Sequence, residues 1–286
     1  MITDPSAAKA TLYLSDRRTM YIGQLAPLLC QNSAASTLIF SLDNTLEVID
    51  PVAKQQYQSR SFLIPAGSQS IINTKDSLLT LCFLDPLGKD LIVLKNKMSN
   101  EIPISNNAPF YSCHNQEDLL IQSARILYEC TSPPEFAFSQ LSRWIGEPEE
   151  GTALTIDPRV KRAVEMIKSS VLENRSVESI AQELNLSVSR LSQLFKQATG
   201  VPVRRFRIWH RIYITAVKMA YGLSLTEACV SSGFSDSSHF SRVFKEIGGI
   251  KPSKVLNSKN DTLIMMLPTE NNPTRIKRDE QSLSLI

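Results

Sequence analysis

Residues 176–200 and 224–249 of this chain repeat one pattern. Each copy holds an amphipathic segment, a tight turn at Asn185-Leu186 or Gly233-Phe234, and a second amphipathic segment. The apolar positions match at an offset of 48 before the turn and 49 after it. The first copy has Val177, Ile180, Ala181, Leu186, Leu191, Leu194 and Phe195 where the second has Leu225, Ala228, Cys229, Phe234, Phe240, Val243 and Phe244. A small residue, Ala181 or Cys229, lets the second segment cross close against the first. The pattern predicts two helix-turn-helix motifs.

The segment between the copies predicts one continuous helix. Apolar side chains in PVRRFRIWHRIYITAVKMA recur at alternating steps of three and four residues, at Phe206, Trp209, Tyr213, Ala216 and Ala220. Such a helix would hold the two motifs at a fixed separation. Upstream, Asp157 followed by Pro158 predicts an N-cap and a first helical position, so we expect this domain to span residues 157–256.

The basic charge of the chain lies in this segment. Residues 157–256 hold 16 Lys and Arg against 8 Asp and Glu, whereas residues 1–156 hold 11 against 16. A basic excess of this kind attracts polyanions, of which nucleic acid is the commonest large one. Charge alone fits a solvated surface equally well, so the evidence for DNA binding must come from the side chains on the two motifs.

The second segment of each motif presents short donors and cations opposite its apolar stripe. A helix in the major groove needs donors of modest size toward base edges and cations toward phosphates. The predicted base contacts are Ser189, Ser192, Gln193, Ser238, His239 and Arg242. The predicted phosphate contacts are Arg190, Lys196, Arg204, Arg205 and Lys245. Arg242 is the strongest reader, because a guanidinium can grip guanine O6 and N7 together. For each serine, a solvated helix face or an N-cap is an equal alternative.

The first half of the chain predicts a different architecture. STLIFSL, TLEVID, QYQSRSFLIP, SQSIINT and SLLTLCFLD are short β-rich runs separated by turn residues, which is typical of a small all-β sandwich or barrel. Helical periodicity begins at Glu117 and resumes after Pro133-Pro134, which predicts two helices within residues 115–146 that cap the barrel or pair with another subunit. We expect this domain to span residues 1–148 and a linker to span 149–156.

Several classes of protein find no support in the sequence. No run approaches eighteen uncharged apolar residues and the first residues lack the pattern of an export signal, so the expectation is a cytoplasmic protein with no membrane contact. The five cysteines include no CxxC pair and no cluster at metal spacing, which predicts reduced thiols. His114 is the one histidine before residue 157 and is expected outside the barrel.

The stretch GFSDSSHFSRVFKEIGGIKPSKV closely resembles the signature of the AraC/XylS family of bacterial transcription regulators. The resemblance covers residues 157–256 and implies two helix-turn-helix motifs placed in successive major grooves on one face of the duplex. The N-terminal half is similar, more loosely, to the cupin-like barrel with which many members bind an effector or dimerise. The implied fold is α+β, with an N-terminal cupin-like barrel and helical hairpin before an all-α domain of two helix-turn-helix motifs joined by a linker helix.

The resemblance implies a sequence-specific regulator, more often an activator, with double-stranded DNA, RNA polymerase, a small-molecule or protein effector and a second copy of the chain as partners. Two alternatives stay open: a cupin-type enzyme fused to a helical domain, and a protein that coats DNA regardless of sequence. A metal-dependent cupin enzyme needs clustered histidines, and the barrel turn holds Ser68, Gln69 and Ser70 instead, so we expect no metal, cofactor or catalysis. Residues 257–286 are polar apart from LIMML and are expected to form a flexible tail.

Overall fold

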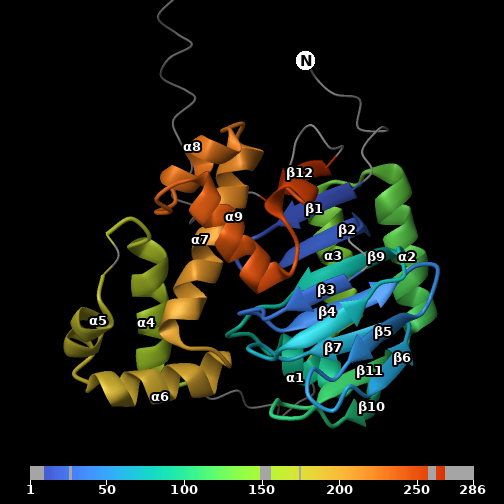
Figure 1. The fold of residues 1–286 in the computed structure, drawn as a ribbon, viewed down its shortest axis with the longest axis horizontal. Coiled ribbons are helices and arrows are strands. Elements are labelled where there is room, and N and C mark those ends of the chain that lie inside the picture. Colours follow the sequence, from blue (N-terminus) through green and yellow to red (C-terminus); the bar gives the residue numbers. More distant parts are fainter. Residues whose placement is uncertain (1–9, 26–27, 149–155, 174, 257–261, 268–286) are drawn as a thin grey trace, which may run out of the picture.

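The computed structural model describes residues 10–25, 28–148, 156–173, 175–256 and 262–267. A sheet-rich N-terminal half lies beside a helical C-terminal half, and the helices of the second half lean on one end of the sheets (Figure 1). The fold class expected from the sequence, an α+β chain with a β-rich N-terminal part and an all-α C-terminal part, is confirmed.

The strands of the N-terminal half form two sheets, and one strand from the end of the chain, β12, joins the larger of them. The larger has eight strands in the order β10-β11-β7-β4-β9-β2-β1-β12, and the smaller has four in the order β3-β8-β5-β6. The strands are β1 Ala10–Leu14, β2 Thr19–Gln24, β3 Leu28–Gln31, β4 Thr37–Ser41, β5 Leu46–Ile49, β6 Gln56–Ser59, β7 Ser61–Ile64, β8 Ser70–Asn73, β9 Leu78–Phe83, β10 Met98–Ile102, β11 Phe110–His114 and β12 Thr262–Met266. Each of the five predicted β-rich runs contains at least one strand.

The larger sheet is buried on both faces. In β4, Leu38 and Phe40 point into a core shared with helices, whereas Ile39 points into a core shared with the smaller sheet. Alternate side chains of a strand face opposite sides, so two apolar cores require a continuous apolar run. The run STLIFSL meets that requirement, whereas β5 of the smaller sheet buries Leu46 and Val48 and leaves Glu47 and Ile49 half-buried.

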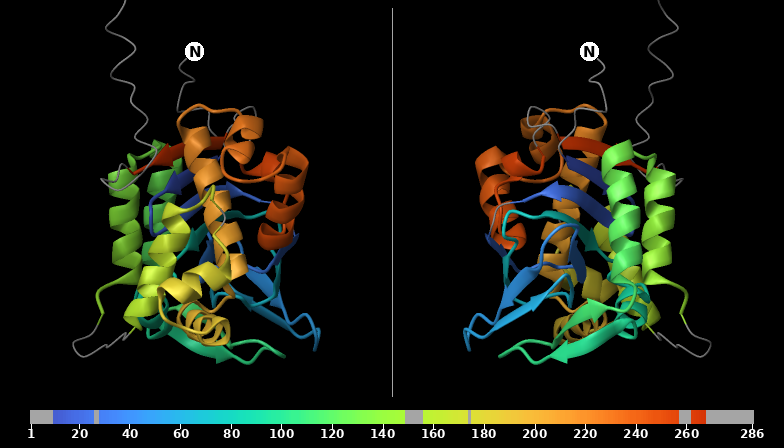
Figure 2. Two further views of the ribbon diagram at one scale, coloured as in Figure 1. Left: turned by 90° about the vertical axis from the view of Figure 1, so that its left-hand side faces the viewer. Right: turned by 90° about the vertical axis from the view of Figure 1, so that its right-hand side faces the viewer.

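Two helices cover the outer face of the larger sheet (Figure 2). They are α2 Glu117–Cys130 and α3 Pro134–Ile145, as the periodicity predicts; a short helix, α1 Asp90–Lys95, precedes them. Trp144 of α3 is 1% exposed, donates its indole N–H to Ser123 Oγ of α2 (2.7 Å), and meets Phe40 of β4 edge-to-face at 5.3 Å. One side chain thus joins both helices to the sheet, so the hairpin caps the sheet.

The helical half holds α4 Pro158–Ser169, α5 Val177–Glu183, α6 Val188–Thr199, α7 Val203–Ala220, α8 Leu225–Val230, α9 Ser237–Gly248 and the 3-10 turn η2 Pro252–Lys254. The predicted linker helix is α7. Asp157 caps α4 by accepting from the amide of Arg159, with Pro158 in the first turn. In the described part of the chain, no helix is both long and apolar enough to cross a membrane.

Two expectations about the ends of the domains are wrong. His114 is not outside the sheet: it is the last residue of β11, 3% exposed, and burial lowers its pKa to about 4. The flexible tail is wrong for residues 262–266, which form β12 and pair with β1 of the first half. At the edge of the sheet the side chains of the apolar run LIMML become half-buried. Residues 257–261 and 268–286 of that predicted tail, and 149–155 of the predicted linker, lie outside the described residues.

Candidate nucleic-acid interface

The two repeats fold into equivalent turns. Asn185 and Gly233, 48 positions apart, both adopt a left-handed conformation, with φ of 53° and 89°. After each turn an amide returns to the first helix: Leu186 donates to the Ala181 carbonyl (2.9 Å) and Phe234 to the Cys229 carbonyl (3.2 Å). Glycine and asparagine tolerate positive φ better than other residues, which explains why these two residue types occupy the turn.

The helix caps extend the equivalence. α5 and α8 begin at N-cap serines, Ser176 and Ser224, whose side chains accept from amides of the first turn. α6 and α9 begin at Ser187 and Asp236, with Asp236 Oδ1 accepting from the His239 amide at 2.7 Å. That hydrogen bond is the main cause of the lowered pKa of Asp236. The C-caps of α6 and α9, Gly200 and Gly249, are 49 positions apart and both left-handed. Caps fix where a helix starts and ends, so the polar faces of α6 and α9 are held alike.

α6 presents all of its predicted DNA contacts to solvent. Leu191 and Phe195 are fully buried on the opposite side. The exposed residues are Ser189, Arg190, Ser192, Gln193 and Lys196. Arg190 Nη1 donates to Gln193 Oε1 (2.9 Å), so a predicted phosphate contact and a predicted base contact are linked before any ligand is present.

α9 presents the second set. Ser238, Arg242 and Lys245 are exposed, and Phe240 is buried beneath them. His239 is half-buried: its Nδ1 lies 3.1 Å from Ser235 Oγ and its ring meets Phe234 edge-to-face at 5.6 Å. The neighbouring turn therefore fixes this ring, which is less available to a base than Arg242.

The start of α7 divides its cations between solvent and the protein. Arg204 is exposed, whereas Arg205 is half-buried and its Nη1 donates to Asn32 Oδ1 of the N-terminal half. Further along, Arg207 Nη2 donates to the Arg175 carbonyl (2.6 Å) and Arg211 Nη2 to the Val171 carbonyl (3.3 Å). The last two cations brace α7 against the residues between α4 and α5.

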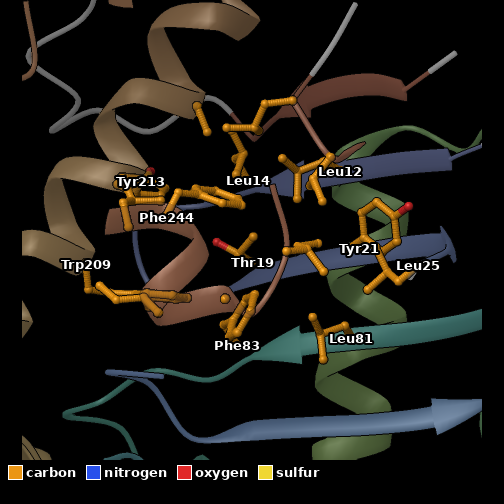
Figure 3. Close-up of a pocket in the computed structure, with 17 residues that line it drawn as sticks. Leu12, Leu14, Thr19, Tyr21, Leu25, Leu81, Phe83, Trp209, Tyr213 and Phe244 are labelled. Atoms are coloured by element: carbon orange, nitrogen blue, oxygen red, sulfur yellow. The ribbon is translucent and has the colours of Figure 1, made fainter. Parts of the chain in front are cut away.

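An apolar cavity lies between the two halves. It has a volume of about 90 Å³ and is lined by side chains of β1, β2 and β9 on one side and of α7 and α9 on the other. Figure 3 shows Leu12, Leu14 and Tyr21 of the sheet facing Tyr213 and Phe244 of the helices. The rings of Phe83 and Trp209, 4.6 Å apart and edge-to-face, close one side.

A polar recess adjoins the cavity and shares Thr19, Phe83, Trp209 and Tyr213 with it. Its other walls include Arg17, Lys168 and His210. Burial, aided by the Lys168 charge, lowers the pKa of His210 to about 4, and its Nε2 is buried without a hydrogen-bond partner among the described residues.

Sequence reasoning found the exposed donors of α6 and α9 but not the cavity. Its walls come from five separate elements and from segments that follow β2 and α9, and no local pattern marks them. The early part of the chain supplies Leu12, Leu14 and Thr19, outside the five predicted β-rich runs.

The comparisons with known proteins agree with the helical half. Residues 180–258 match a family model described as a helix-turn-helix domain. Over 105 residues the chain is 37% identical to the arabinose operon regulatory protein of Escherichia coli strain K12, a match that covers 35% of each protein. The chain thus spans about a third of the length of the curated relatives it matches.

Solved structures resemble the chain more completely. ToxT from Vibrio cholerae O395 has a TM-score of 0.53 at 17% sequence identity, covering 84% of this chain and 96% of that one. Wild-type ToxT from V. cholerae strain SCE256, described as unsaturated fatty acid bound, has a TM-score of 0.52 at 17% identity and covers 84% and 94%. At this identity the likeness shows a common fold.

Proposed function

We propose that this chain belongs, through its helix-turn-helix domain, to the AraC/XylS family, and that it is a sequence-specific DNA-binding transcription regulator whose N-terminal half receives a signal. The observation that carries the proposal is the duplicated geometry: α6 and α9 have equivalent turns and caps, and both leave a polar, cationic face exposed. A duplicated surface of this kind fits two successive major grooves.

The roles of the exposed residues follow from their chemistry. Arg242 reads a guanine, and Ser238, Ser189, Ser192 and Gln193 donate to other base edges. Lys196, Lys245, Arg190 and Arg204 contact phosphates, and Arg205 joins them when it leaves Asn32. His239 is retained as a weaker base contact because Ser235 and Phe234 hold its ring. We place the boundaries of this domain at residues 157 and 256.

Footprinting of the full chain on genomic DNA fragments tests the proposal. A regulator should protect a bounded site that contains two major-groove patches about one helical turn, roughly 34 Å, apart for each monomer. Uniform protection without preferred sites would instead identify a protein that coats DNA. Stoichiometric iron or zinc after purification without an affinity tag would revive the alternative of a cupin-type enzyme.

We also propose that the regulator acts as a homodimer that activates transcription by contact with RNA polymerase. Leu119 and Ile126 of α2 and Phe136 of α3 are 42%, 51% and 43% exposed on the hairpin that caps the sheet. Several large apolar side chains exposed on one helical hairpin favour a protein contact over a solvated surface. The helical hairpin is therefore the proposed dimer contact.

The signal, we propose, is an apolar small molecule with an anionic end that enters between the halves. The cavity supplies apolar walls, and the adjoining recess supplies two cations, Arg17 and Lys168, beside one carboxylate, Asp16. The fatty acid described with ToxT belongs to this class of molecule. Because ligand sites usually measure about 300–1,000 Å³, the cavity must widen to admit such a molecule. Binding would therefore change how the halves pack.

Tryptophan fluorescence measures this binding directly. The chain has two tryptophans, and Trp144 is buried between α3 and β4, so Trp144→Phe leaves Trp209 of the cavity as the reporter. Titration with a C16 unsaturated fatty acid should change the emission of this variant. Ala216→Leu, which fills the cavity, should weaken the response, and the matching C16 alcohol should bind more weakly than the acid. Equal responses in all three cases would contradict the proposed site.

A further inference from the structure

The strand β12 attaches the segment after the second helix-turn-helix motif to the sheet of the N-terminal half. It pairs with β1 in parallel along its whole length, from Thr262 beside Ala10 to Met266 beside Leu14. The ladder continues where the Leu267 amide donates to the Leu14 carbonyl (2.8 Å). Figure 1 shows β12, in red, next to β1 at the edge of the sheet. Residues that follow the helical half in sequence thus complete the sheet of the other half.

The side chains of β12 contact both halves of the protein. Ile264 and Met266 pack against the apolar cluster that contains Ile212 of α7. Met265 and Leu267 pack against the cluster beneath α2 and α3. α7 itself lies in contact with β12. The backbone of β12 is therefore part of the sheet, and Met265 and Leu267 pack on the face covered by α2 and α3. Ile264 and Met266 pack on the opposite face, where α7 joins the two motifs.

This attachment adds to other contacts that dock the helical half on the sheets. The Asn32 amide donates to the Ile247 carbonyl at the end of α9 (3.1 Å), and Phe83 of β9 packs on Trp209 of α7. Asn32 also accepts from Arg205, a predicted phosphate contact. The docked arrangement therefore engages a cation that the DNA complex needs.

We infer that β12 is a strap that stabilises the docked arrangement of the two halves and lowers affinity for DNA, so that its release from β1 raises that affinity. The second part of this inference rests on the proposed DNA-binding function. A contact that exists in only one of two arrangements of a protein stabilises that arrangement by the free energy of the contact, and so shifts the equilibrium between the two. β12 is such a contact, because undocking α7 costs the packing of Ile264 and Met266.

Two deletions in the full chain separate the strap from the residues around it. Deletion of residues 259–286 removes β12 and keeps the region that matches the helix-turn-helix model. Deletion of residues 268–286 keeps β12 and serves as the matched control. Small-angle scattering without DNA measures the radius of gyration, and fluorescence anisotropy with a footprinted duplex measures affinity.

We expect the 259–286 deletion to have the larger radius and to bind DNA about fivefold or more tightly than the control, the lower range of typical couplings between sites. Equal radii of gyration for the two deletions would contradict the inference that β12 stabilises the docked arrangement, whether or not either protein binds DNA. A larger radius with equal or weaker DNA binding would overturn its restraint on affinity. If neither protein binds any duplex, the proposed DNA-binding function is contradicted, while the radius of gyration still tests whether β12 stabilises the docked arrangement.

A second variant covers the case in which the deletion fails to fold by circular dichroism. Full-length Ile264→Ser with Met266→Ser keeps the backbone of β12 and weakens its packing toward α7. The same increases in radius and affinity are expected, relative to the unsubstituted chain. Their absence in a folded double variant would overturn the inference.

Discussion

Replacing Phe195 by alanine is expected to lower the free energy of unfolding by about 3–5 kcal/mol, the usual range for a buried phenylalanine. Phe195 of α6 is fully buried and meets Phe206 of α7 edge-to-face at 5.4 Å. Its removal leaves a cavity where the first motif rests on the linker helix. Urea denaturation followed by circular dichroism measures the loss.

The internal repeat supplies the control for this prediction. Phe244 occupies the equivalent place in the second motif, 49 positions later, but it is half-buried and lines the cavity between the halves. Phe244→Ala should therefore cost less than Phe195→Ala, because part of its ring already contacts empty space. Equal losses would contradict the different packing of the two copies.

Arg242→Ala is expected to cost roughly 1–3 kcal/mol of binding to the specific site and to relax preference at one base pair. The guanidinium is exposed on α9, where it can present two parallel donors to a guanine. Titrations against the footprinted duplex and a scrambled duplex measure the loss. The loss should fall on the footprinted duplex.

Lys245, one turn along the same helix, is the matched control. Lys245→Ala should weaken both duplexes alike and reduce the salt slope of binding by about one, as the loss of one phosphate contact does. If both variants lose the same affinity on both duplexes, Arg242 does not read a base.

The helical half could be predicted from sequence because its signals are local. The turn at Gly233, the stripe ending at Phe195 and the cap at Asp157 each depend on residues within a few positions. The repeat doubled that evidence, because the turn and the apolar positions of the first copy have counterparts in the second.

The features that sequence missed depend on contacts between distant residues. The run LIMML has no pattern of its own that selects strand, helix or tail, and its partner Ala10 lies 252 positions before Thr262. His114 was misplaced because its strand, β11, follows the predicted strand region and pairs with β7, far earlier in the chain. Likewise, nothing in the sequence around Arg205 distinguishes it from the other basic residues beside it, because its partner Asn32 comes near it only in the folded chain.

The pairing of β12 with β1 also constrains how the protein folds while the ribosome is still synthesising it. β1 and α3 are complete once residue 145 has been synthesised, yet the strand that covers the outer side of β1 ends 121 residues later, at Met266. At about 5–20 residues per second, that interval is roughly 6–24 s. During this interval, the edge of β1 that pairs with β12 in the finished fold has no partner strand. Unpaired strand edges can pair with other chains and lead to aggregation. Slower translation of residues 146–266 should therefore lower the soluble yield.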